Sequence, residues 1–462
     1  MQAESLRLVG QDAQVPLVTG ETVRYVNLDY AASAPALQTV ADAVAEFMPW
    51  YSSVHRGAGF KSRAATAAYE GAREAVRAFF NARTDDSIVF TRNTTDSINL
   101  MASTLPETTR IIGFAGEHHA NLLPWKRCAS VFLPIAASPE ELLGRLEEAL
   151  NDGSAEATLV AITGASNVTG EIVPIEAVTA LAHRYGARVL LDAAQLAPHA
   201  PIDMQALGVD YLAMSGHKLY APYGAGVLIG PPDWLDAGEP FLRGGGAVKL
   251  VTVDEVVWAE MPDRQEAGSP NVVGAVALGV ACDTLAAAGM QRLADQEHEL
   301  WRYARDRFNA IRGWQHYRIW NADHPRVGLF TFNLDGYGYD ELAAILSAEH
   351  GIGVRHGCFC AHPLMIELLH VDRPEADSLI DATRRGEHPH LPGAARMSFG
   401  LGTTREDVDR AADALAAIAE EGPRWTYRCS TLSGDCEPDP DPRPLPELPL
   451  RYARPRRGSE AS

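Results

Sequence analysis

Cysteine is scarce in this chain, with six residues in 462. The first residues also lack the basic start and apolar core of a secretory signal. Proteins that are not exported fold in a reducing compartment, where thiols stay free. We therefore expect reduced thiols in a cytoplasmic protein, and no disulfide framework.

Excess positive charge and long apolar runs are missing as well. The formal net charge is −20, and nucleic acids and anionic membranes repel an acidic surface. The longest apolar stretch, near residues 272–282, is interrupted by glycine and is far shorter than the ~20 residues of a membrane span. We expect no nucleic acid and no membrane as a partner.

What the chain does contain, from about residue 29 to residue 285, is an alternation of short β-rich and amphipathic helical runs. The β-rich runs lie at residues 88–91, 110–113, 159–163, 188–191, 211–215 and 226–229. Helical patterns separate them, for example at residues 64–80, 140–150 and 175–185. This order predicts an α/β fold with a mostly parallel central sheet, whose sites form at the carboxyl ends of its strands.

The pattern changes after residue 286. A long polar helix near residues 290–311 precedes β-rich runs at 327–334 and 395–399 and helical runs at 339–350 and 405–420, which predicts a smaller α+β domain. Further on, proline occupies every second position from Pro438 to Pro446, which excludes helix and central strand. We expect an arm (1–28), a large domain (29–285), a small C-terminal domain (286–425) and an extended or disordered tail (426–462).

Polar residues end two of the predicted strands. Asp192 and Gln195 follow one of them, and the sequence SGHK, residues 215–218, ends the next. Lys218 is suited to form an imine with the aldehyde of pyridoxal 5′-phosphate (PLP), and Asp192 to pair with its protonated pyridine nitrogen. Gln195 would donate to the phenolic oxygen of the ring. The plainer alternatives are a solvated lysine and a helix cap at Asp192, but they do not explain the combination.

Three further segments offer groups for the same cofactor. Ser215 and His217 can donate hydrogen bonds to a phosphate. Thr94 and Thr95 open a helical run, where free N–H groups attract an anion, although simple capping by threonine explains this segment equally well. His118, in EHHAN after another strand, could stack on the ring and move protons, or be structural.

Residues 351–363 read GIGVRHGCFCAHP, and their glycines suggest a loop. A thiolate at Cys360 could attack the sulfur of a cofactor-bound cysteine and keep it as a persulfide. Arg355 and Arg396 are candidates to bind the substrate carboxylate. A buried structural role for Cys360 is one alternative. Another is zinc bound by Cys358, Cys360, His356 and His362, but a C-x₂-C pair is missing and we expect no metal.

From residue 27 to 418 the chain resembles class V aminotransferase-fold PLP enzymes of the cysteine desulfurase and selenocysteine lyase group. The matching segments are NLDYAASAP, VHRGAGFKSRAAT, RNTTDSINL, EHHANLLPW, SNVTGEIVPI, LLDAAQLAPH, SGHKLYAPYGAGVL, EAGSPN and RHGCFCAHP. Each segment is weak alone, and their joint occurrence is specific. The resemblance implies the aspartate-aminotransferase fold (fold type I) and conversion of L-cysteine to L-alanine with sulfane sulfur left on Cys360.

The resemblance also implies a role for each matching residue. Lys218 would bind PLP and move the substrate α-proton, and His118 would stack on the ring. Asp192 and Gln195 would hold the ring, while Asn167, Arg355 and Arg396 would bind the substrate carboxylate. Phosphate ligands would be Thr94, Thr95, Ser215 and His217, joined by Ser269 acting on the neighbouring subunit of a homodimer.

Two features depart from the family pattern. Cys358 is an extra thiol that could relay the persulfide or merely pack, and the tail with Cys429 and Cys436 has no counterpart. These differences leave the sulfur acceptor, which could be a protein, open. Two other functions remain possible at this point: a PLP-dependent aminotransferase, epimerase or other β-lyase, and a non-catalytic sulfur-carrier scaffold.

Overall fold

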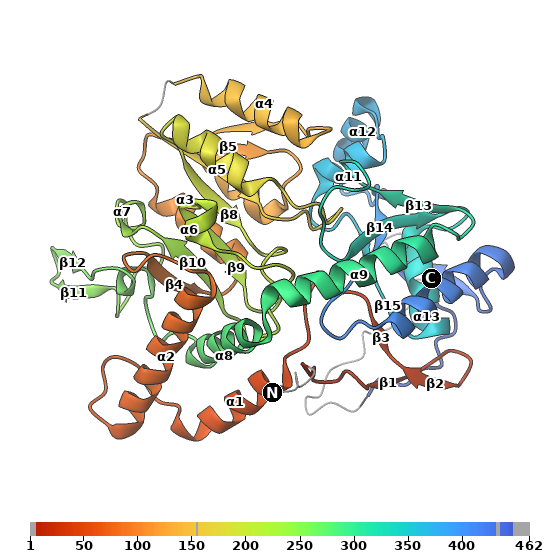
Figure 1. The fold of residues 1–462 in the computed structure, drawn as a ribbon, viewed down its shortest axis with the longest axis horizontal. Coiled ribbons are helices and arrows are strands. Elements are labelled where there is room, and N and C mark those ends of the chain that lie inside the picture. Colours follow the sequence, from red (N-terminus) through yellow and green to blue (C-terminus); the bar gives the residue numbers. More distant parts are fainter. Residues whose placement is uncertain (1–5, 154–155, 431–434, 447–462) are drawn as a thin grey trace.

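The computed structural model describes residues 6–153, 156–430 and 435–446, and its centre is a seven-stranded sheet (Figure 1). In spatial order the strands are β4 (Ser87–Thr91), β10 (Gly226–Gly230), β9 (Tyr211–Ser215), β8 (Arg188–Asp192), β7 (Ala157–Thr163), β5 (Thr109–Phe114) and β6 (Ala129–Leu133). Strand β10 runs antiparallel to both its neighbours, and the others are parallel to one another. The predicted α/β fold with a mostly parallel sheet is confirmed.

Helices cover both faces of this sheet because successive side chains on each strand point to opposite sides. Leu191 of β8 faces the cluster that includes α8, whereas its neighbour Leu190 faces the cluster that includes α3. The helices of this part are α1 (Gln38–Phe47), α2 (Phe60–Phe79), α3 (Thr94–Thr104), α4 (Pro139–Leu150), α5 (Ile175–Arg184), α6 (Met204–Leu207), α7 (Pro232–Leu235) and α8 (Val272–Ala288).

A second core lies around a four-stranded antiparallel sheet, at the right of Figure 1. Its strands, in order, are β13 (Trp314–Tyr317), β14 (Leu329–Leu334), β17 (Ala394–Ser398) and β16 (Arg355–Gly357). The helices of this part are α9 (Met290–Phe308), α10 (Tyr339–His350), α11 (His362–Leu368), α12 (Arg373–Arg384) and α13 (Arg405–Glu421). Leu285 belongs to the first core and Trp301 to the second, so we propose to keep the domain limit near residue 285.

Four pairs of short strands in the described residues lie outside these sheets, three of them before the tail. The N-terminal arm forms β1 (Gln14–Pro16) with β2 (Thr22–Arg24), and then β3 (Val26–Asn27) pairs with β15 (Ile352–Gly353) beside the small domain. The hairpin of β11 (Val248–Val251) and β12 (Val256–Trp258) projects from the large domain (Figure 1). Within the described residues no single helix could cross a membrane, and α8 with α9 passes that test only as a pair bent by 76°.

The described part of the tail is ordered and corrects one sequence prediction. Of the two states expected for the tail, extended or disordered, this part adopts the extended one: strands β18 (Tyr427–Cys429) and β19 (Cys436–Pro438) form an antiparallel hairpin. A disulfide joins Cys429 to Cys436, so the prediction of reduced thiols is wrong for these two. The hairpin lies against α10, where the buried Glu349 accepts hydrogen bonds from the Tyr427 hydroxyl (2.9 Å) and the Trp425 N–H (3.1 Å). Proline spacing gave no sign of this packing.

Candidate active site

One cavity of about 480 Å³ collects nearly all the predicted site residues. It opens at the carboxyl ends of the parallel strands, where the β8 and β9 ends meet the loops after β4 and β5 and the small domain. The predicted residues that line it are Thr94, Thr95, His118, Asn167, Asp192, Gln195, Ser215, His217, Lys218, Arg355, Cys360 and Arg396. Sequence reasoning therefore located one site from segments more than 300 residues apart.

The floor of the cavity is formed by the ends of β8 and β9. Asp192 is the last residue of β8, and Lys218 follows the end of β9 by three residues. Gly216 permits the tight turn between Ser215 and Lys218, because a Cβ at this position would lie 2.8 Å from the Ala225 carbonyl oxygen. This turn places the half-buried Lys218 in the same cavity as the buried carboxylate of Asp192.

Burial changes the acidity of both groups. It lowers the pKa of Lys218 to about 8, an effect that the Asp192 carboxylate opposes and Arg396 reinforces. Burial also raises the pKa of Asp192, against the Ala194 N–H and the charge of Lys218. Asp192 Oδ1 accepts the Ala194 N–H at 3.0 Å, a local turn rather than a helix cap. An amine so placed is a stronger nucleophile near neutral pH than a solvated lysine.

The anion-binding end of the cavity lies at the start of α3. The side chain of Asn93 caps this helix by accepting the Asp96 N–H at 2.9 Å, so capping by the threonines is not their role. Ser215 Oγ lies 2.8 Å from both the backbone N and the Oγ1 of Thr94, which fixes β9 against α3. The hydroxyls of Thr94 and Ser215 therefore lie at a helix N-terminus, and Thr95 and His217 line the same cavity.

His118 lies on another wall of the cavity and is neutral at physiological pH. Its Nδ1 accepts the Ala120 N–H at 3.0 Å, so the ring proton resides on Nε2. Burial, reinforced by the charge of Lys218, lowers the pKa of His118 to about 4. The ring is thus a fixed, uncharged surface with one N–H to donate.

A buried carboxyl group beside His118 was missed by sequence reasoning. Glu117 accepts the Thr163 N–H (2.9 Å) and the Asn121 side-chain N–H (2.8 Å), and Asn121 in turn accepts from Trp125 (3.0 Å). Burial raises the pKa of Glu117 to about 8. The chain of contacts ties the His118 segment to β7. In the sequence, the glutamate that begins EHHAN was the feature that could have indicated this buried acid.

Arg396 and Asn167 join the two domains at the cavity wall. Arg396, buried in β17, donates from Nη1 to the Asn167 carbonyl (2.9 Å) and from Nη2 to Asp29 (3.2 Å), and its guanidinium stacks on Phe359 at 4.9 Å. The Arg396 Nε is buried with no partner among the described residues. A buried donor without a partner costs free energy unless a ligand satisfies it. This guanidinium is therefore prepared for an anionic group.

Cys360 lies on an exposed turn rather than in a core, which rules out the buried structural role. Phe359 and Cys360 have φ values of 55° and 57°, two successive residues in the left-handed region. Asn167 donates to the Phe359 carbonyl at 2.7 Å, and the His119 N–H donates to the Cys360 carbonyl at 2.8 Å. These bonds hold a strained turn in place, which is typical of functional sites. The segment before it is not all loop, since β15 and β16 occupy part of it.

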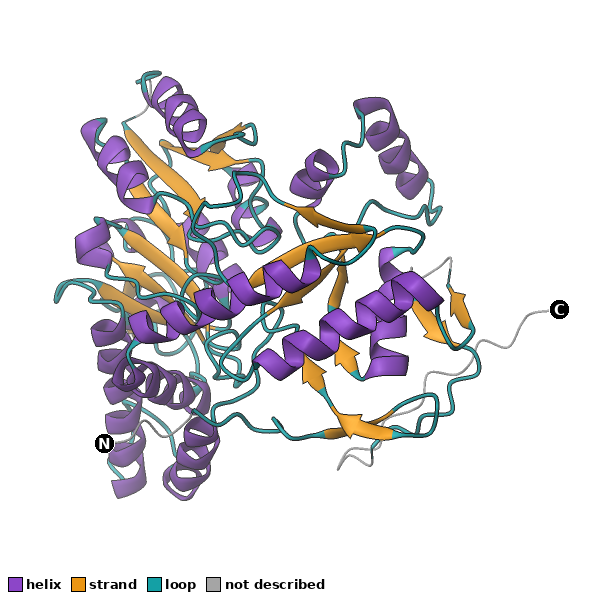
Figure 2. Ribbon diagram, turned by 45° about the vertical axis from the view of Figure 1, so that its right-hand side comes forward, coloured by secondary structure: helices purple, strands orange, loops and turns teal. Residues whose placement is uncertain are grey.

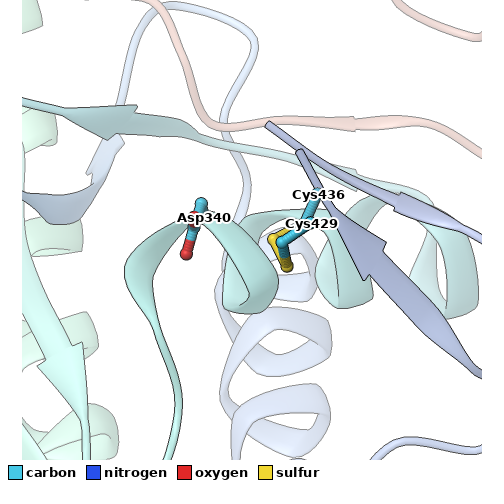
Figure 3. A group of neighbouring side chains, drawn as sticks. All are labelled: Asp340, Cys429 and Cys436. Atoms are coloured by element: carbon cyan, nitrogen blue, oxygen red, sulfur yellow. A yellow bond between two sulfur atoms is a disulfide. The ribbon is translucent and has the colours of Figure 1, made fainter. Parts of the chain in front are cut away.

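Two expectations concern residues outside this cavity. Ser269 is exposed and does not line it in a single chain. For zinc, the described residues bring only Asp340, Cys429 and Cys436 within ligand reach of one another, and the disulfide occupies both sulfurs (Figure 3). The alternative set of Cys358, Cys360, His356 and His362 is not brought together.

Comparisons with known proteins agree with this geometry. The sequence profile described as Aminotransferase class-V matches residues 26–411. The chain belongs to the class V aminotransferase family. It is 36% identical over 407 residues to a probable cysteine desulfurase of Halalkalibacterium halodurans, covering 86% of this chain and 93% of that protein. It is also 36% identical over 411 residues to the cysteine desulfurase of Klebsiella pneumoniae (87% and 94%).

Solved structures of class V enzymes share the fold. The apo structure of cysteine desulfurase from Thermococcus onnurineus NA1 has a TM-score of 0.76 at 30% identity, covering 90% of this chain and 99% of that one. The cysteine desulfurase CsdA from Escherichia coli has a TM-score of 0.72 at 33% identity (86% and 95%). The chain is therefore a PLP-dependent class V enzyme of the cysteine desulfurase type.

The cavity fits the cofactor of this family. Gln195 donates from Nε2 to the Ala31 carbonyl at 2.7 Å, whereas its Oε1 is buried without a partner among the described residues. Such an orphaned polar atom on a cavity wall indicates a missing polar ligand. Lys218, Asp192 and the hydroxyl-rich end at Thr94 then supply an amine, a carboxylate and an anion site within one 480 Å³ space.

Proposed function

We propose that this chain converts L-cysteine to L-alanine and retains the sulfane sulfur on Cys360. The observation that carries the proposal is the cavity itself, because a half-buried lysine, a buried carboxylate and an exposed cysteine line the same space. The names of the relatives support the reaction class.

PLP, when bound, attaches to a lysine amine and draws electrons away from the α-carbon of an amino acid. Lys218 is the proposed attachment point and the base that moves the α-proton. Asp192 would hold the pyridine nitrogen protonated, and Gln195 and His118 would fix the ring from its edge and its face. Thr94, Thr95, Ser215 and His217 would bind the phosphate.

The substrate carboxylate would bind Arg396, with Asn167 and Arg355 beside it. The free Nε of Arg396 and the stacking on Phe359 support this assignment. With its carboxylate held there, the substrate would present its sulfur to the Cys360 turn, which follows Phe359 directly. The Cys360 thiolate would take the sulfur, and Lys218 or His118 would return a proton to the remaining three-carbon product.

Quantifying alanine and sulfide together tests the proposal. Purified holoenzyme given L-cysteine and a thiol reductant should form both in equal amounts. The variant Cys360→Ala should lose both while it retains its cofactor, and the matched variant Cys128→Ala, changed outside the cavity, should keep both. Unchanged alanine formation by Cys360→Ala would instead favour a lyase in which this thiol is incidental.

We also propose that the chain forms a homodimer in the cytoplasm. Large apolar side chains lie exposed near the start of α2, where the Trp50 and Phe60 rings are 6.3 Å apart. Ser269, exposed in one chain, would then complete the phosphate site of the partner. Four free cysteines are in keeping with a reducing compartment. Sedimentation of the purified protein as a monomer would contradict the dimer.

A further inference from the structure

A second cavity, of about 530 Å³, adjoins the Cys360 turn. Both cavities are lined by Arg355, Phe359 and Cys360. Cys358 lines only the second cavity, and so does Cys429 of the tail disulfide. The exposed Cys360 therefore lines both the active site and a second cavity that Cys429 of the C-terminal hairpin also lines.

The hairpin is fixed at this place by contacts with the small domain. It packs on α10 through Glu349. Asp435, next to Cys436, places its Oδ1 3.9 Å from Nε2 of His356, and His356 precedes Cys358 by two residues. Figure 3 shows the disulfide against α10 beside Asp340. Its two cysteines differ in exposure, because Cys429 is exposed and Cys436 is half-buried. In dithiol pairs, the exposed thiol is the one that attacks and the shielded one resolves.

We propose that Cys429 and Cys436 are a redox-active pair that takes the sulfane sulfur from Cys360 and releases it as sulfide. This inference rests on the proposed function, because Cys360 must first carry a persulfide. The disulfide of the structure is then the spent form of the pair. With this pair, the chain could release its sulfur as sulfide by itself, in addition to passing it to any acceptor protein.

The steps balance in atoms and electrons. The Cys429 thiolate attacks the outer sulfur of the Cys360 persulfide, the bond from that sulfur to Cys360 breaks, and Cys360 leaves as a thiolate. The Cys436 thiolate then attacks Cys429 Sγ, the disulfide forms and hydrosulfide leaves. The dithiol loses two electrons and the sulfane sulfur gains them. One thiol proton ends on the sulfide and the other on Cys360 or water. An external thiol or dithiol resets the pair.

A single-turnover experiment tests the pair on the full-length holoenzyme. The protein is reduced with a phosphine, freed of reductant without air, and given one equivalent of L-cysteine. We expect alanine, about one sulfide per chain, and a Cys429–Cys436 peptide lighter by two hydrogens. The variant Cys436→Ser should release about tenfold less sulfide and carry an extra sulfur on Cys429. The control Cys128→Ser should behave as the wild type.

Other outcomes overturn the proposal. The pair has no such role if alanine forms while the extra sulfur stays on Cys360 and the pair stays reduced. Equal sulfide release by wild type and Cys436→Ser leads to the same conclusion. One zinc ion per reduced chain, with sulfide release unchanged in the variant, would assign the pair and Asp340 to a metal.

A second loading route separates this proposal from the proposed function. If no alanine forms, the desulfurase reaction has failed, and the pair is tested with a small-molecule persulfide that charges Cys360 directly. Sulfide release with closure of the disulfide supports the pair even then. A stable persulfide on Cys360 beside a reduced pair contradicts it.

Discussion

Arg396 offers the sharpest test of how the site recognises its substrate. Two of its nitrogens already bind Asn167 and Asp29, and the buried Nε has no partner among the described residues. The variant Arg396→Lys keeps the positive charge. It loses Nε and the planar guanidinium that would bind Asn167, Asp29 and the substrate carboxylate at the same time. A hydrogen bond to a charged group contributes about 1.5–3 kcal/mol. Losing it should weaken L-cysteine binding by roughly tenfold to 150-fold.

Comparison with a substrate that has no carboxylate separates recognition from structural damage. The spectrum of the bound cofactor reports binding of both L-cysteine and cysteamine. Wild type should prefer L-cysteine, and Arg396→Lys should lose most of that preference while its affinity for cysteamine stays nearly constant. The variant Arg355→Lys, at the exposed arginine beside the same carboxylate, should reduce the preference much less, because an exposed ion pair contributes only ~0–1 kcal/mol. An undiminished preference in Arg396→Lys would refute the assignment.

Three further predictions concern the cofactor groups. Because burial lowers the pKa of Lys218 to about 8, PLP uptake by the cofactor-free chain should accelerate as the pH rises through 8, with more of the amine neutral, and then level off; a midpoint near 10 in stopped-flow absorbance would contradict this. Since burial lowers the pKa of His118 to about 4, its ring should stay neutral in an NMR titration from pH 8 to pH 5, and a midpoint near 6.5 would show a solvated ring. Ser215→Ala removes a hydroxyl bound twice to Thr94 and should weaken PLP binding by roughly tenfold in equilibrium titration; unchanged affinity would exclude Ser215 from the phosphate site.

The parts of the fold that follow from local chemistry were predictable. Strand and helix periodicity gave the parallel sheet, and the rule that sites form at carboxyl ends placed Asp192 and Lys218 together. Twelve of the predicted site residues line one cavity, and ten of them end a strand, open a helix or lie on a nearby loop, whereas Arg355 and Arg396 belong to strands of the small domain. Short sequence motifs were therefore enough to predict most of the candidate site.

The rest depends on contacts that no local pattern encodes. Asp29 reaches Arg396 across 367 positions, and the pairing of Arg396 with Asn167 spans 229. Cys429 and Cys436 looked like free thiols in a proline-rich tail, but packing on α10 turns that segment into a hairpin with a disulfide. Cys429 and Asp435 of this hairpin lie in the lining of the second cavity beside Cys360.

Mass spectrometry after borohydride reduction of the yellow holoenzyme tests whether Lys218 carries the cofactor. Reduction makes the bond between PLP and its lysine permanent, and we expect the added mass on the peptide that contains Lys218, with Lys218→Ala remaining unmodified. Modification of another lysine, or a cofactor that washes away after reduction, would contradict it.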